Sequence, residues 1–334
     1  MWDSLGYLLL FAAKALIIVA LVLFLLMMIL VLVSKAREKN GGHLLVRNLS
    51  EKLRETKEAL LGEIQTKSEF KKGLKEQKKK LKALGKNPPP KPRVFVLTFQ
   101  GDLRASAVAS LREEITAVLT VATPKDEIVL KLESPGGMVH TYGLAAAELE
   151  RIRKRKIPLT VVVDTMAASG GYLMACVGNK ILAAPFAIIG SIGVIFQLPN
   201  FHRVLDEKHV DFEQITVGNY KRTLTMFGKN TEEGRNKLRD ELEDIHQKFK
   251  DLIVEYRKDL DINTVATGEH WLAKRALELK LIDGLMTSDD YLMEKNEKAD
   301  VYEIVFEIKQ SLGSRLKMAY EHFSAPQGLG PLLK

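Results

Sequence analysis

The 334-residue sequence has few of the residues on which several kinds of site depend. It contains one cysteine, Cys176, which excludes an intramolecular disulfide and a thiolate-bound metal cluster. Its seven histidines are scattered, and it has no H-E-x-x-H or G-x-x-x-x-G-K-[ST] motif, so zinc-peptidase and P-loop chemistry have no support. We expect no metal and no other cofactor. With 46% hydrophobic and 28% charged residues, the chain is also neither disordered nor mostly embedded in a membrane.

The excess of positive over negative charge is confined to one segment. Between Lys35 and Lys91 there are 17 Lys and Arg against 7 Asp and Glu, which accounts for the whole formal charge of +8 and leaves the rest slightly acidic. A basic nucleic-acid-binding domain would not concentrate its charge in this way. We expect no nucleic-acid partner.

The longest apolar run lies near the amino terminus. From Ala15 to Val33 there are 19 consecutive residues without a polar side chain, and a helix of this length spans about 28 Å, close to the hydrocarbon thickness of a bilayer. A cleaved signal peptide is the alternative, but its apolar stretch would be shorter and end in a small-residue cleavage site, whereas Ser34 and Lys35 follow here. The sequence therefore predicts a transmembrane helix within an N-terminal membrane anchor, residues 1–34.

Residues 35–92 are predicted to form a basic helical stalk and a linker. From Glu51 to about Leu84 a thin apolar stripe recurs at helical spacing in a polar segment, which is typical of a stalk or a solvated helix. The lysines around Lys79 would suit contact with anionic lipid headgroups, although ordinary solvation explains them as well. The run Pro88-Pro89-Pro90-Lys91-Pro92 ends any helix and imposes an extended spacer.

Strands and helices alternate beyond the linker. Strands are predicted at Val94–Phe99, Glu127–Leu132, Leu159–Val163 and Phe212–Val217, and helices at Ser106–Leu119, Thr141–Lys154, Ser169–Val177 and from about Thr231. The apolar stretch Ile181–Pro199, with pieces such as Val194–Phe196, is interrupted by proline and glycine, so we interpret it as buried strands rather than a second membrane span. The alternation predicts a layered α/β domain over residues 93–309. A tail of unassigned role, residues 310–334, follows.

Two glycine-containing turns follow predicted strands. In Glu133-Ser134-Pro135-Gly136-Gly137, the glycines allow backbone amides to point into a cleft, as an oxyanion site requires, although a plain tight turn has the same residues. In the second turn, Ser169 lies between small residues where a strand becomes a helix. A serine there is exposed at the positive end of a helix, which is typical of a nucleophile. A helix cap explains Ser169 equally well.

A serine nucleophile needs a base, and Lys221 is the candidate. It follows the predicted strand Phe212–Val217, and sites of α/β folds gather at strand ends. Lysine is a base at neutral pH only where burial disfavours its charged form. The alternative is a solvated loop lysine.

Five short motifs carry a resemblance to a known family. They are Ser134-Pro135-Gly136-Gly137, Ala168-Ser169-Gly170-Gly171-Tyr172, Gly190-Ser191-Ile192-Gly193-Val194, Gly218-Asn219-Tyr220-Lys221 and Leu277-Glu278-Leu279-Lys280-Leu281-Ile282-Asp283-Gly284-Leu285. With these motifs in this order, the chain from about Val94 to Leu285 resembles the signal-peptide-peptidase-A family of membrane serine peptidases. The resemblance implies a fold similar to ClpP and crotonase proteins.

The resemblance also implies the residues of a Ser/Lys dyad. Ser169 would be the nucleophile and Lys221 the general base. Ser191 would orient the lysine, and the Gly136 and Gly170 amides would form the oxyanion hole. Peptides or membrane-protein fragments near the lipid bilayer would be the substrates, and several catalytic domains would form a homo-oligomeric ring.

Two other functions fit the same residues. One is a crotonase-like acyl-CoA enzyme, because that fold also uses paired amides around a carbonyl oxygen, although nothing suggests a CoA site. The other is a catalytically inactive membrane scaffold whose stalk recruits partners.

The side of the membrane is also open. The resemblance implies a single-pass protein of the bacterial inner membrane with a periplasmic catalytic domain, whereas the cations Lys35, Arg37, Lys39 and Arg47 after the span predict a cytoplasmic one.

Overall fold

The computed structural model describes residues 14–28, 42–83 and 91–308. They divide between two compact units, one from Met1–Leu44 and Phe306–Lys334 and one of Leu45–Val305. Residues 14–28, within the first unit, are helical and exposed. No helix in the described ranges is both long and apolar enough to span a bilayer. The end of the predicted apolar run, most of the proline-rich linker and the tail 310–334 lie outside these ranges.

Most of a seven-stranded sheet lies in the second unit, at its centre. Its strands are, in spatial order, β1 (Gly42–Asn48), β10 (Asp300–Ile308), β2 (Arg93–Gln100), β3 (Glu127–Glu133), β4 (Leu159–Val163), β6 (Lys180–Ala183) and β9 (Gly284–Leu285). From β10 to β9 every neighbouring pair is parallel. Parallel neighbours need crossover connections, and helices α4 (Val108–Val121) and α5 (Val139–Lys154) supply the first two.

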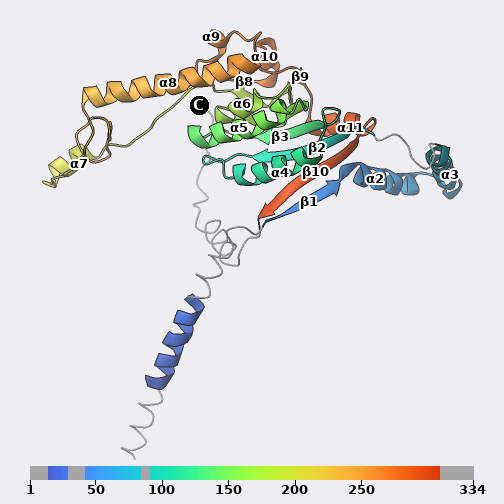
Figure 1. Ribbon diagram of the computed structural model, residues 1–334, viewed down its shortest axis with the longest axis horizontal. Coiled ribbons are helices and arrows are strands. Elements are labelled where there is room, and N and C mark those ends of the chain that lie inside the picture. Colours follow the sequence, from blue (N-terminus) through green and yellow to red (C-terminus); the bar gives the residue numbers. More distant parts are fainter. Residues whose placement is uncertain (1–13, 29–41, 84–90, 309–334) are drawn as a thin grey trace, which may run out of the picture. The chain divides into compact units, whose positions relative to one another are not determined.

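Both faces of this sheet are covered, which explains its continuous apolar strands. In β2, Phe95, Leu97 and Phe99 face one cluster with α4, α5 and α6 (Gly170–Ala175). The alternate residues Val94 and Val96 pack with α11 (Ser288–Asn296), so this helix covers the opposite face. Figure 1 labels these helices around the sheet. The prediction of a layered α/β domain is confirmed.

A second, three-stranded sheet carries the candidate nucleophile. It consists of β5 (Met166–Ala168), β7 (Ile188–Gly190) and β8 (His270–Leu272). Strands β5 and β7 are parallel, with Ala168 opposite Gly190, and β7 and β8 are antiparallel.

The remaining helices include one that was predicted closely. Thr231 caps α8 (Glu232–Tyr256), because its Oγ1 accepts a hydrogen bond from the Gly234 amide at 3.1 Å. The helices α9 (Ile262–Val265) and α10 (Ala273–Glu278) follow. The predicted stalk is two helices, α2 (Leu49–Ile64) and α3 (Lys67–Ala83), and the strand β1 before them was not predicted.

Two predicted strands are wrong. Residues 212–217 are irregular, and Ile215 and Val217 are 92% and 93% exposed. Their alternation is typical of a half-buried strand, but no sheet in the described chain pairs with them. Residues 194–196 are irregular as well, with Ile195 and Phe196 exposed.

Candidate active site

Ser169 occupies a strained turn between β5 and α6. Its φ is +51°, in the left-handed region that a residue with a side chain rarely adopts. The Ser169 amide donates to the Gly190 carbonyl at 2.8 Å, so the neighbouring strand holds this backbone in place. The residue is half-buried, which leaves it open to solvent on one side. Strain of this kind occurs at active sites, where the surroundings maintain it.

Ser191 lies beside Ser169 at the end of the paired strand. Because Ala168 is opposite Gly190 in a parallel ladder, the next residues of the two strands are neighbours as well. Adjacent strands are about 4.8 Å apart. Ser191 also has a left-handed backbone, with φ of +52°, and its amide donates to the Glu269 carbonyl at 2.6 Å. The structure therefore brings together two serines that are distant in sequence.

Gly136 packs directly against the nucleophile turn. Its φ is +83°, and a Cβ there would lie 2.7 Å from the Ala168 carbonyl oxygen, the Gly170 nitrogen and the Ser169 Cβ. The preceding Ser134 extends the β5 ladder, because its amide donates to Met166 at 2.8 Å and its carbonyl accepts from Ala168 at 3.0 Å. Pairing of Ser134 with β5 therefore places the Gly136 turn next to Ser169.

The amides around Ser169 differ in their hydrogen bonding. The Gly136 amide donates to Ser134 Oγ at 3.1 Å. Among the described residues, the Gly137 and Gly170 amides have no acceptor. Gly170 is the first residue of α6, where unpaired amides and the helix dipole favour negative charge. The Gly137 and Gly170 amides are therefore free to donate to an oxyanion, whereas the amide of Gly136, the predicted donor, already donates to Ser134.

Lys221 does not approach Ser169 within one copy of the chain. It lies in residues 195–231, which we call the α7 segment after its helix α7 (His202–Glu207). The neighbouring Tyr220 hydroxyl lies 3.5 Å from Glu233 at the start of α8. Phe249, further along α8, belongs to the hydrophobic cluster that also contains α6. It lies about 24 Å from Glu233 along the helix, at 1.5 Å per residue. Figure 1 shows the α7 segment at the start of α8.

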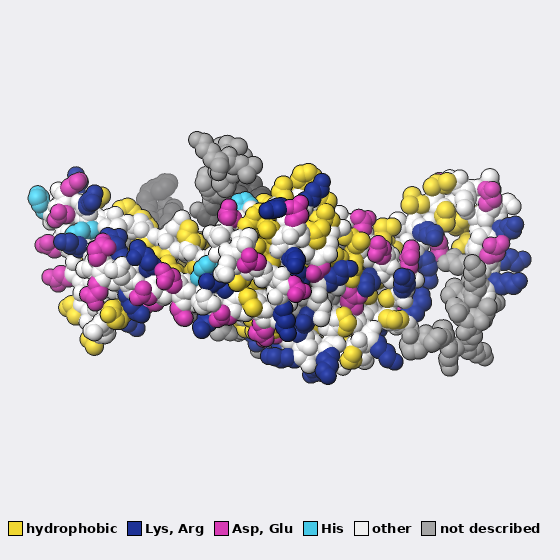
Figure 2. All heavy atoms as spheres, turned by 90° about the horizontal axis from the view of Figure 1, so that it is seen from above, with side chains coloured by type: hydrophobic (Ala, Val, Ile, Leu, Met, Phe, Trp, Pro, Cys, Tyr) yellow, Lys and Arg dark blue, Asp and Glu magenta, His cyan; other side chains and the backbone are white. Residues whose placement is uncertain are grey.

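The α7 segment is internally packed but exposes apolar side chains. The Phe227 ring contacts those of Phe201 and Phe212, with centroids 6.1 and 5.8 Å apart, and Asn200 donates to two carbonyls of the segment. Its exposed large apolar residues are Ile195, Phe196, Phe201, Val204, Val210, Phe212, Ile215, Val217, Tyr220, Met226 and Phe227. In Figure 2, hydrophobic side chains are visible among the charged ones at this end.

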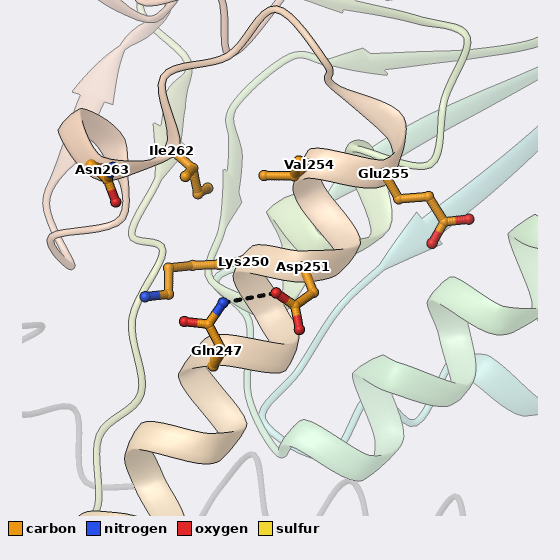
Figure 3. Close-up of a pocket in the computed structure, with 7 residues that line it drawn as sticks. All are labelled: Gln247, Lys250, Asp251, Val254, Glu255, Ile262 and Asn263. Atoms are coloured by element: carbon orange, nitrogen blue, oxygen red, sulfur yellow. Dashed lines mark hydrogen bonds between the residues drawn. The ribbon is translucent and has the colours of Figure 1, made fainter.

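A cavity on α8 is separate from these residues. It has a volume of about 380 Å³, and α8 and α9 line it with polar and apolar side chains, including Gln247, Asp251 and Ile262 (Figure 3). Gln247 Nε2 donates to Asp251 Oδ1 at 2.8 Å across two successive turns. None of the predicted site residues lines this cavity.

The sequence did not indicate a role for Tyr142 or for the Ser134 side chain. Both are fully buried and hydrogen-bonded to each other below the Gly136 turn. A tyrosine one turn into a helix carries no local signal of a site.

Comparisons with known proteins identify relatives of the chain. The family model "Peptidase family S49 N-terminal" matches residues 3–149, and "Peptidase family S49" matches residues 151–302. "Probable protease SohB" of Haemophilus influenzae is 51% identical over 219 residues, which cover 66% of this chain and 62% of that protein. "Probable protease SohB" of Buchnera aphidicola is 51% identical over 232 residues, covering 70% of this chain and 69% of that protein. The match thus spans slightly less than two thirds of the Haemophilus relative.

A solved structure is similar at a lower level. The 1510-N membrane-bound stomatin-specific protease is 17% identical, with a TM-score of 0.42, over 62% of this chain and 86% of that one.

Proposed function

Because the chain belongs to peptidase family S49, we propose that it is a serine endopeptidase that cleaves peptides through an acyl-enzyme on Ser169. The observation that carries this proposal is the strained Ser169 turn, packed against Gly136 and beside Ser191. A hydroxyl at the start of α6, close to free amides, suits attack on a carbonyl.

The proposed reaction has two steps. An uncharged Lys221 amine takes the Ser169 proton while Oγ attacks the peptide carbonyl. The peptide C–N bond then breaks, and Lys221 returns the proton to the departing amine of the product as the acyl-enzyme forms. In the second step, Lys221 takes a proton from a water that attacks the acyl carbonyl, and the acyl group is released as Ser169 regains its proton. The Gly170 amide would bind the oxyanion with an amide of the Gly136–Gly137 turn. Since the Gly136 amide donates to Ser134, Gly137 is the free donor of that turn.

We propose that the dyad forms between copies of the chain in a homo-oligomeric ring. The exposed Lys221 and the exposed apolar residues of the α7 segment support this arrangement, because both would be buried against a second copy. Burial there would also disfavour the charged form of Lys221, as its role requires, and Ser191 of the copy that supplies Ser169 would orient it.

Substitution of the dyad tests the activity. We expect Ser169→Ala and Lys221→Ala to lower peptide hydrolysis roughly 10⁴-fold, because the two groups act as a unit. Lys229→Ala is the matched control, since Lys229 is another exposed lysine of the α7 segment, and should retain activity. A fluorophosphonate should label Ser169 in the unmodified protein.

Other results would favour the alternative functions. Hydrolysis of acyl-CoA thioesters without peptide hydrolysis would indicate a crotonase-like enzyme. A protein that neither cleaves peptides nor reacts with the fluorophosphonate would be a scaffold.

We further propose that the protein is anchored once in the bacterial inner membrane through Ala15–Val33, with peptides or membrane-protein fragments as substrates. The catalytic domain would face the periplasm. A topology reporter fused after Lys334 tests on which side of the membrane the catalytic domain lies. Activity of a reporter that functions only in the cytoplasm would contradict the periplasmic assignment.

A further inference from the structure

A buried tyrosine lies below the turn that faces Ser169. Tyr142, in the first turns of α5, is fully buried, and its hydroxyl donates to the Asp102 carbonyl oxygen at 2.8 Å. Ser134 Oγ lies 2.6 Å from the same Tyr142 oxygen. Because a carbonyl oxygen only accepts, the Tyr142 proton points to Asp102 and the Ser134 hydroxyl must be the donor between the two side chains.

The hydrogen bonds form a chain with one direction. The Gly136 amide donates to Ser134 Oγ at 3.1 Å, Ser134 donates to Tyr142, and Tyr142 donates to Asp102. Ser134 is fully buried as well. An unpaired polar group is costly at such a site, so each member depends on the next one. The backbone of Gly136 is therefore held through two side chains.

Close packing joins the same tyrosine to the residue after Ser169. A Cβ at Gly170 would lie 2.4 Å from Tyr142 Cγ, so the ring lies directly against the Gly170 backbone. A Cβ at Gly101 would lie 2.3 Å from Ser134 Oγ and 2.5 Å from the Tyr142 hydroxyl. Tyr142 thus supports Gly170 by contact and Gly136 through Ser134.

We propose that Tyr142 and Ser134 are positioning residues that hold the amides of the Gly136–Gly137 turn and of Gly170 in register for the oxyanion. This inference rests on the proposed function, because it assigns these amides a role in the reaction. Preorganised donors act mainly on the transition state, where charge develops on the oxygen. Loss of the positioning contacts should therefore lower kcat more than it raises KM.

The experiment compares two tyrosine-to-phenylalanine variants of the full chain. Tyr142→Phe removes the hydroxyl at the centre of the network and keeps the ring. Tyr172→Phe is the matched control, because Tyr172 is also fully buried and its hydroxyl donates to a backbone carbonyl, that of Leu281, at 2.8 Å. We expect Tyr142→Phe to lower kcat about 10-fold to 100-fold with little change in KM, and Tyr172→Phe to stay near the unmodified rate.

Hydrogen exchange provides a readout that does not depend on activity. The amides of a peptide spanning residues 134–138 should exchange faster in Tyr142→Phe than in Tyr172→Phe. If Ser134→Ala and Tyr142→Phe act through one network, their effects on kcat should not add in the double variant.

The outcomes separate the two proposals. Equal kcat in the two tyrosine variants, a change confined to KM, or unchanged exchange would overturn the positioning role. If the unmodified protein hydrolyses no peptide but Tyr142→Phe still exchanges faster, the proposed function is overturned instead. The support of the turn by Tyr142 would then remain valid.

Discussion

Gly136 shows how one residue can limit what the site tolerates. Its φ of +83° strains any residue with a side chain, and a Cβ would meet three atoms of the nucleophile turn at 2.7 Å. Two of these atoms belong to backbone, which moves less readily than a flexible side chain. A side chain at this position therefore displaces either the Gly136 backbone or the nucleophile turn, residues 168–170.

Gly136→Ala should therefore lower peptide hydrolysis about 100-fold, because displacement of the turn misplaces groups at Ser169. Gly143→Ala is the control within α5, where a Cβ would meet nothing within 4 Å. We expect that control to retain activity and to raise the free energy of unfolding by about 0.5–1 kcal/mol, since glycine is unfavourable inside a helix. Equal activity of the two variants would contradict the prediction.

Cys176 is a second residue whose surroundings decide its chemistry. Burial raises the pKa of its thiol to about 12, despite the opposing charge of Arg257. The thiolate is the reactive form. We therefore expect no labelling of the native protein by a maleimide at pH 8 and complete labelling in urea, measured by mass spectrometry. Rapid labelling of the native protein would show that α6 opens without global unfolding.

At the scale of elements, Asp126 joins the start of β2 to the turn before β3. Arg93 donates to its carboxylate at 2.7 Å, and the Thr123 amide and hydroxyl each donate at 2.8 Å. Burial opposes the charged form of Asp126, but the hydrogen bonds of Arg93 and Thr123 outweigh it and hold the pKa well below its usual value. The folded state therefore binds this proton less readily than the unfolded state.

Asp126→Asn should cost about 2 kcal/mol of unfolding free energy at pH 7. A carboxyl with a lowered folded pKa stabilises the fold above its unfolded pKa, and that contribution disappears as the pH falls through the folded pKa. The difference from the unmodified protein should thus be constant above about pH 5 and shrink below about pH 4. Asp259→Asn, at an exposed position, is the control for urea unfolding. A difference independent of pH would contradict this account.

The elements were predictable where the chain itself supplies their neighbours. The bounds of β4 match the prediction because all five of its residues are buried between covering layers. Residues 212–217 have a strand pattern without a partner in the described chain, and a local pattern contains no information about partners. For the same reason, the register that places Ser191 beside Ser169 and the contact between Ser134 and Tyr142 could not be predicted from spacing. Only the resemblance connected the motifs.

At the scale of the whole molecule, the proposed dyad would make assembly part of the chemistry, because Lys221 is separated from Ser169 within one copy of the chain. If the dyad forms between copies, a ring that mixes Ser169→Ala chains with Lys221→Ala chains contains some sites with both groups intact. Co-expression of the two variants should therefore restore peptide hydrolysis that neither has alone.

Two further variants control this complementation. Ser169→Ala chains mixed with chains that carry both substitutions should stay inactive. Ile215→Asp, which puts a charge on the apolar surface of the α7 segment, should reduce the mass measured by light scattering together with the activity. Absence of complementation in an intact oligomer would refute a dyad shared between copies.

The pairing of β5 with β7 limits where the chain can change in length. Ser169 and Ser191 each follow the last paired residue of a strand, so one residue added within either strand would turn the following serine to the opposite face. A residue added beside Phe186, which is 78% exposed in the loop before β7, would leave the ladder intact. Insertions should therefore accumulate in that loop during evolution and be eliminated from the two short strands.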